Sequence, residues 1–97
     1  MIMRITWGKL RSGTWSEFEQ AYKDTVVGKE VKGLQGRWLA QDVNDPDGGF
    51  AVSLWESQED MQAYEQSAFF QQEALPKLQP YFAGEYTTYR CDVKYSQ

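Results

Sequence analysis

The chain has 97 residues and a formal net charge of −4, and it is rich in aromatic side chains, with four Trp, six Tyr and five Phe. The length suits a single domain over residues 1–97, and the acidic balance excludes the basic surface that nucleic acids require. Histidine is absent and Cys91 is the only cysteine, which excludes an internal disulfide and zinc sites built on paired cysteines.

Hydropathy excludes two further classes of protein. No stretch approaches the ~18 consecutive apolar residues of a membrane-spanning helix, and no basic run would hold the chain on an anionic membrane. The first ten residues, MIMRITWGKL, are too polar for a secretory signal peptide. Together with the lone thiol, these features favour a reducing cytoplasm.

The first predicted element is a strand over residues 2–10. Its side chains alternate between two faces, and large apolar groups occur on both, since Met3 and Trp7 share one face whereas Ile2 points to the other. A strand with one solvated face would carry polar groups at one parity. The pattern therefore indicates that both faces of the sheet are covered.

A helix is predicted to begin at Trp15 and to end between Gly28 and Gly33. Thr14 and Glu17 give the T-x-x-E pattern of a capping box, whose side chains satisfy free backbone N–H groups. An apolar stripe at helical spacing follows, and it consists of Trp15, Phe18, Tyr22 and Val26.

Two strands, over residues 34–43 and 50–56, are predicted to form an antiparallel hairpin. Residues 44–49 between them, NDPDGG, favour a turn, because proline fixes one φ angle and glycine accepts positive φ. The second strand is again apolar at both parities, since Trp55 and Phe50 point to opposite faces.

The remaining elements are predicted to be helical and then extended. Ser57 is the expected N-cap of a second helix, on which Met61 and Tyr64 face inward. A further helical piece over residues 69–78 is limited by two prolines, and a last strand is expected over residues 85–95.

The resulting order, βαββαβ, predicts an α+β, ferredoxin-like fold with an antiparallel four-stranded sheet and two helices on one face. Two helices cover only one face of such a sheet, so the other apolar face needs another cover. The simplest cover is a second copy of the chain, packed sheet on sheet. We therefore expect a homodimer through the helix-free face.

A resemblance that extends over nearly the whole chain is clearest in two segments, RITWGKLRSGTWSEFEQAY and GLQGRWLAQDVNDPDGGFAVSLWESQEDMQAYE. They resemble the antibiotic biosynthesis monooxygenase (ABM) domain of the dimeric α/β-barrel superfamily. The most specific part is the join Leu54-Trp55-Glu56-Ser57, followed by Glu59, Met61 and Tyr64. The resemblance implies a dimeric α/β barrel with a cavity between helices and sheet in each subunit.

Members of this family differ in their chemistry, and the haem-degrading branch is disfavoured here. That branch uses a histidine in the second helical region as iron ligand, with an asparagine and a tryptophan shaping the pocket. The corresponding positions in this chain are occupied by Ala74, Thr6 and Tyr64. Because all three differ and the chain has no histidine, we expect no haem. The resemblance to the cofactor-free members of the family implies no metal or other cofactor.

The resemblance instead implies a cofactor-independent monooxygenase, an oxidoreductase acting on a small aromatic metabolite of the quinol or anthrone kind. In that chemistry the anion of the substrate reduces dioxygen directly, so the protein must bind a flat ring, favour its anion and exclude water. Two alternatives stay open. One is a non-catalytic module that binds a small ligand or only assembles, and the other is a non-oxygenase enzyme, such as an isomerase or decyclase, on the same fold.

The sequence does not identify the catalytic residues or the proton acceptor, but it offers candidates for the substrate pocket. These are Trp55, Tyr64, Phe70, Tyr81, Arg37 and Arg90. The aromatic members would stack on a flat substrate, and the arginines would orient an anion. Core packing competes as an explanation for the aromatic residues, and a solvated or interface role competes for Arg90. An open cavity would favour a binding site, whereas filling by Phe69, Phe70 and Leu78 would favour a purely assembling protein.

Overall fold

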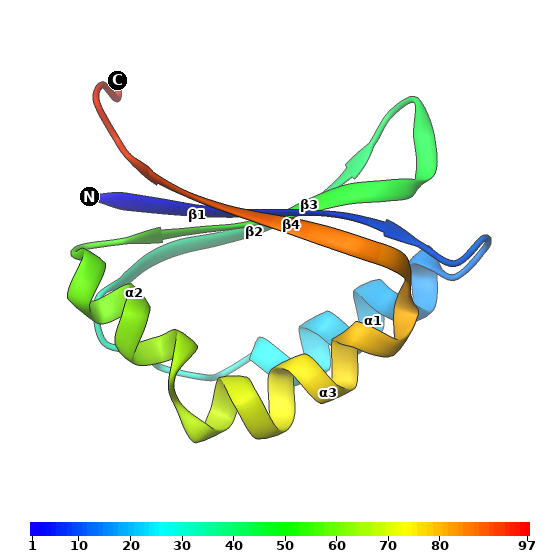
Figure 1. Ribbon diagram of the computed structural model, residues 1–97, viewed down its shortest axis with the longest axis horizontal. Coiled ribbons are helices and arrows are strands. Elements are labelled where there is room, and N and C mark those ends of the chain that lie inside the picture. The colour runs from blue at the N-terminus through cyan, green and yellow to red at the C-terminus, as the bar shows by residue number, and fades with distance from the viewer.

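The computed structural model describes residues 1–97, which form one four-stranded antiparallel sheet in the order β2-β3-β1-β4 with helices on one face (Figure 1). The strands are β1 (Ile2–Leu10), β2 (Leu34–Asp42), β3 (Asp45–Trp55) and β4 (Phe82–Asp92), and the helices are α1 (Trp15–Val26), α2 (Gln58–Glu65) and α3 (Leu75–Leu78). A π-helical segment (Phe69–Ala74) precedes α3, and a 3₁₀ turn (Gln79–Tyr81) follows it. This confirms the predicted α+β, ferredoxin-like fold. None of the helices is long and apolar enough to cross a membrane.

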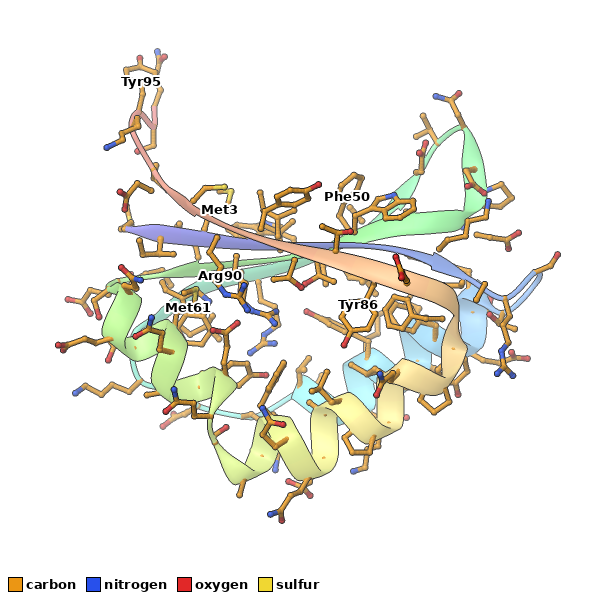
Figure 2. All side chains as sticks on the ribbon, viewed as in Figure 1. Met3, Phe50, Met61, Tyr86, Arg90 and Tyr95 are labelled. Atoms are coloured by element: carbon orange, nitrogen blue, oxygen red, sulfur yellow. The ribbon has the colours of Figure 1, made fainter.

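Strand register decides which side chains face the helices. Arg4 on β1 lies opposite Ser53 on β3 and Arg90 on β4. Both arginines bind Glu65 of α2, so these positions belong to the helix-covered face. Figure 2 shows Arg90 pointing toward the helices and Met3 pointing away from them. On each strand, side chains two residues apart point to the same face of the sheet, and adjacent side chains point to opposite faces.

The β2–β3 hairpin departs from the sequence prediction. The predicted turn over residues 44–49 is wrong, because β3 already begins at Asp45 and the chain reverses over the two residues before it. Gly49 lies inside β3 without positive φ. A Cβ added there would lie 2.5 Å from the carbonyl oxygen of Ala40 on β2 and 2.7 Å from the ring of Trp15 on α1. Glycine is thus needed for close packing of α1 on the sheet, and the lengthened hairpin curls away from the helices (Figure 1).

The ends of α1 also differ in detail from the prediction. The helix begins at Trp15 as predicted, but the capping box is wrong. The Thr14 hydroxyl donates to the carbonyl of Arg11 at 2.7 Å and makes no bond to the helix. The helix then ends at Val26, two residues before Gly28. The Thr14 side chain therefore stabilises the turn before the helix and does not cap the helix.

The last strand begins earlier than predicted. β4 runs over Phe82–Asp92 rather than 85–95, because Phe82 pairs with Leu10 at the end of β1. Its ring also packs edge-on against Phe18 of α1, with 5.7 Å between ring centroids. The first residue of β4 is therefore fixed both by its pairing with β1 and by its contact with α1.

The core lies at the join between β3 and α2. Trp55 and Met61 are fully buried, and the ring of Tyr64 packs on Trp55 with centroids 5.1 Å apart. The indole N–H of Trp55 donates to the hydroxyl of Ser53 at 2.8 Å. The predicted N-cap is confirmed, since Ser57 accepts a hydrogen bond from the backbone N–H three residues later at 3.1 Å. This join fixes the position of α2 over the sheet.

The helix-free face of the sheet is apolar. Figure 2 shows Met3 and Phe50 on this side, pointing away from the helices. Four aromatic side chains of the face are exposed in the single chain, namely Trp7 (38%), Trp38 (52%), Phe50 (40%) and Tyr89 (55%). A soluble monomer rarely exposes so continuous an apolar patch. The face has the composition of a contact surface.

Candidate functional site

A cavity of about 90 Å³ lies between the sheet and the helices. Its aromatic walls are formed by Phe18, Tyr22, Tyr64, Phe70, Phe82 and Tyr86. In a purely assembling protein, this space was expected to be filled by side chains that include Phe70 and Leu78. In the structure both residues border the cavity and leave it open. The molecule therefore keeps an open space at its centre that a small ligand can enter.

Three of the six predicted pocket residues line this cavity: Arg37, Tyr64 and Phe70. They come from β2, from α2 and from the π-helical segment. The rings of Tyr64 and Phe70 lie 5.2 Å apart. Single-turn π-helical insertions recur at functional sites, and here the insertion places Phe70 against the cavity.

The other three predicted residues lie elsewhere. Trp55 is in the core, with no exposed surface. Tyr81 packs edge-on against Phe18, with 5.9 Å between ring centroids, and does not line the cavity. Arg90 ends on the carboxylate of Glu65, outside the cavity wall. The strand-to-helix tryptophan thus supports the site from beneath and does not border it.

Sequence reasoning missed several polar residues of the wall, and Tyr22 and Arg4 are the most important of them for its chemistry. Tyr22 was counted only as part of the apolar stripe of α1, yet its hydroxyl end reaches the interior. Arg4 stands at the strand parity that faces the helices. In the sequence, Arg4 is recognisable as a charged residue between two apolar neighbours in β1. Only the strand register shows that its side chain points toward the helices.

Arg37 is the half-buried cation of the cavity. Its guanidinium carbon lies 5.6 Å from the ring centroid of Tyr64, and no carboxylate forms an ion pair with it. Burial works to lower the pKa of Arg37, but the oxygens of Tyr64 and Tyr22 outweigh it, and the pKa is raised. The guanidinium is therefore charged at every physiological pH.

Tyr22 supplies a phenol to the same space. Burial raises the pKa of Tyr22, although the positive charge of Arg37 acts in the opposite direction. The phenol thus stays protonated at neutral pH and is available as a hydrogen-bond donor. No carboxylate and no histidine is among the lining residues, so the cavity combines apolar walls with donors and positive charge.

Glu65, at the end of α2, joins the helix to two strands. Its Oε2 accepts from Arg4 Nε at 2.7 Å and from Arg90 Nη2 at 2.6 Å. The Arg4 guanidinium also lies over the ring of Phe70, 5.1 Å from its centroid. The charge of Arg4 is therefore taken up by Glu65, and the ion-pair cluster holds Phe70 and the end of α2 beside the cavity.

Glu65→Gln is expected to lower the free energy of unfolding at neutral pH by about 1–3 kcal/mol, because hydrogen bonds to a charged partner are lost. Burial alone would raise the pKa of Glu65, but the hydrogen bonds from Arg90 and Arg4 prevail and lower it. A carboxyl with a lowered pKa in the folded state stabilises the fold above its usual pKa, and this stability is lost as the pH falls below about 4.5.

Urea denaturation from neutral pH down to about pH 3 measures this linkage. The wild type should lose more stability below about pH 4.5 than the Glu65→Gln variant. Glu85→Gln, at an exposed position of β4, is the matched control and should follow the wild-type curve. Parallel curves for wild type and Glu65→Gln would contradict the assigned role of Glu65.

A larger open groove, of about 650 Å³, lies on the outer side of α2. It runs between residues 29–32 and the start of the π-helical segment, where the Lys29 ammonium lies over the Phe69 ring at 5.2 Å from its centroid. Tyr64 borders both this groove and the inner cavity. The groove is therefore the solvent-side neighbour of the cavity, with Tyr64 between them.

Comparison with solved structures shows the same fold in other proteins. A structure from Methanosarcina mazei Go1, described as a conserved protein, matches with a TM-score of 0.85 at 16% identity, over 96% of this chain and 92% of that one. A structure from Bordetella bronchiseptica, provisionally described as an antibiotic biosynthesis monooxygenase, matches with a TM-score of 0.83 at 22% identity, over 95% of each chain. A third, from Nitrosomonas europaea and provisionally described in the same way, has a TM-score of 0.80 at 13% identity, over 98% of this chain and 100% of that one.

At such identities the structural similarity shows the fold alone. No protein with a curated description matches the chain. The family model described as antibiotic biosynthesis monooxygenase matches residues 1–73. The matched region runs from β1 into the π-helical segment and includes Arg37, Tyr64 and Phe70 of the cavity wall. The chain therefore belongs to the antibiotic biosynthesis monooxygenase (ABM) family.

Proposed function

We propose that the protein is a cofactor-independent monooxygenase of the ABM type that acts on a single-ring quinol in the central cavity. The observation that carries the proposal is an aromatic-walled cavity that contains a charged guanidinium and no carboxylate. Such walls favour a flat aromatic ligand, and the guanidinium favours an anionic oxygen on it. Membership of the ABM family supports the oxygenase chemistry.

The size of the cavity supports the smaller of the two substrate classes expected from the sequence. Its volume of about 90 Å³ is well below the ~300–1,000 Å³ of typical small-molecule sites. A single-ring quinol requires less rearrangement of the walls than the three fused rings of an anthrone. We therefore favour a quinol as the substrate.

The proposed reaction balances without an added reductant. The quinol first loses a phenolic proton to water, and the resulting anion transfers electrons to dioxygen. One oxygen atom forms a new carbon–oxygen bond on the ring, and the other leaves as water with two hydrogens of the substrate. The product is a hydroxyquinone, and all four electrons come from the quinol. The protein binds the ring, stabilises its anion and keeps bulk water away.

Oxygen uptake with single-ring quinols and with an anthrone tests this proposal. Wild-type protein should consume quinol and dioxygen in equal amounts, well above the rate without protein, and should favour the quinols. Ala74→Leu, which places a larger side chain in the cavity wall, should fold and lose turnover. Ala68→Leu, at an exposed position of the chain, is the control and should keep it. Absence of uptake, or uptake unaffected by Ala74→Leu, would overturn the proposal, and quinol binding without uptake would identify a binding module instead.

We further propose that the working form is a homodimer joined through the helix-free sheet face. The exposed aromatic side chains of Trp7, Trp38, Phe50 and Tyr89 support it, because a self-complementary apolar patch of this kind is buried by two-fold pairing. A second sheet on this face would shield the strands that carry the cavity wall.

A further inference from the structure

We propose that Arg37, Tyr22 and Tyr64 form an anion site that binds a single-ring phenol as its phenolate and ionises it at neutral pH without a protein base. This inference rests on the proposed function for the class of ligand, and it assigns the ionisation to the charge of Arg37 acting together with two phenol donors. The three residues come from β2, α1 and α2, so the site exists only in the folded chain.

The first argument is the unbalanced charge of Arg37. Two other arginines of the helix-covered face, Arg4 and Arg90, share the carboxylate of Glu65 at 2.7 and 2.6 Å. Arg37 has no such partner, and its guanidinium carbon lies 5.6 Å from the ring centroid of a neutral side chain of the aromatic wall, Tyr64. A charge taken out of water without a partner is unfavourable. A ligand that brings a negative charge into the cavity would remove this deficit.

The second argument is the set of groups that face Arg37 from every element around it. Tyr22 approaches from α1 and Tyr64 from α2, and both raise the pKa of Arg37 against the effect of burial. Arg4 from β1 and Tyr86 from β4 are the other titratable side chains of the wall, and the charge of Arg4 is already matched by Glu65. No carboxylate belongs to this set. The field there favours anions and disfavours amines.

The third argument is the absence of a proton acceptor among the lining residues. Burial keeps the pKa of Tyr22 raised although Arg37 lies beside it, so the charge of Arg37 alone does not ionise a phenol there. A bound phenolate would also accept hydrogen bonds from Tyr22 and Tyr64. These bonds add to an opposite charge within about 4–6 Å, which lowers a pKa by about 1–3 units, and together they favour the anion without a protein base. The phenolic proton passes to water through the open side of the cavity. Arg37 and the phenol O–H groups of Tyr22 and Tyr64 then hold the oxyanion. Electrostatics thereby replaces general-base catalysis.

A chromophoric phenol tests the site without any turnover. 4-Nitrophenol is coloured only as its phenolate and is not a quinol, so titrating it with protein across pH reports the ionisation of the bound ligand. The wild type should bind it and lower its apparent pKa by at least about one unit. Arg37→Gln should weaken phenolate binding at least about tenfold and abolish the pKa shift. Arg37→Lys keeps the charge and should retain part of the shift.

Controls separate this inference from the proposed function. Arg11→Gln removes the same charge from an exposed turn outside the cavity and should behave as the wild type. Nitrophenolate binding with a lowered pKa but no quinol oxidation would keep the anion site and reject the oxygenase. Quinol oxidation that is equally fast in Arg37→Gln, or nitrophenol bound without a pKa shift, would overturn the anion site. Circular dichroism of the two Arg37 variants checks that each one folds.

Discussion

Truncation of Trp55 to alanine is expected to lower the free energy of unfolding by about 3–5 kcal/mol, the largest effect of any single truncation in this chain. The side chain has no exposed surface and packs on Tyr64 with centroids 5.1 Å apart. Its removal would leave a cavity at the join of β3 and α2 and an unpaired hydroxyl on Ser53. Since small domains have only about 5–15 kcal/mol of stability, a large share of the protein would be unfolded near body temperature.

Urea denaturation followed by circular dichroism measures this effect. Trp55→Phe, which keeps most of the volume but loses the N–H bond to Ser53, should lower the stability by only about 1–2 kcal/mol. If alanine and phenylalanine at this position cost the same, the hydrogen bond and not the packing would be the main contribution. A loss below about 1 kcal/mol for Trp55→Ala would contradict the placement of this residue in the core.

Replacement of Trp38 by glutamate is expected to dissociate the proposed dimer, raising its dissociation constant at least about a hundredfold. Trp38 stands on β2 opposite Val52 of β3, on the face without helices, and 52% of it is exposed in the single chain. In the dimer, glutamate at this position would place a charge between two apolar sheets without a partner. In the single chain it would face water, so the fold of the monomer should persist.

Sedimentation velocity over a range of concentrations measures this association. Phe50→Glu, on the neighbouring strand of the same face, should have the same effect as Trp38→Glu. Gln72→Glu adds the same charge at an exposed position of the π-helical segment and should leave the dimer intact. A wild-type protein that sediments as a monomer at high concentration would refute the dimer, whatever the variants do.

Much of the fold was readable from the sequence because periodicity is a local property. The alternation of β1 and the stripe on α1 each follow from side chains a few residues apart, and both elements were located correctly. The hairpin turn was predicted wrongly because one of its glycines, Gly49, is required by contacts with residues distant in the sequence. Gly49 is small to admit the ring of Trp15, which comes from a helix more than thirty residues away in the chain. Turn chemistry therefore gave the wrong explanation for it.

The site was predicted less completely than the fold. Arg37, Tyr64 and Phe70 were named as pocket residues and line the cavity, whereas Tyr22 was read only as part of an apolar stripe. The sequence alone could not show which strand parity faces the helices, and that parity separates Arg4 and Arg37 on the wall from Trp38 on the opposite face. Register, a property of the assembled sheet, supplied the missing information.

The most direct measurement of the central claim follows both oxygen atoms during quinol oxidation under isotopically labelled dioxygen. A cavity that stabilises the quinol anion and lets it reduce dioxygen should give a hydroxyquinone with one labelled oxygen and labelled water, without hydrogen peroxide. An unlabelled product, or one hydrogen peroxide formed for each quinol consumed, would show that the protein does not insert oxygen and would contradict the account.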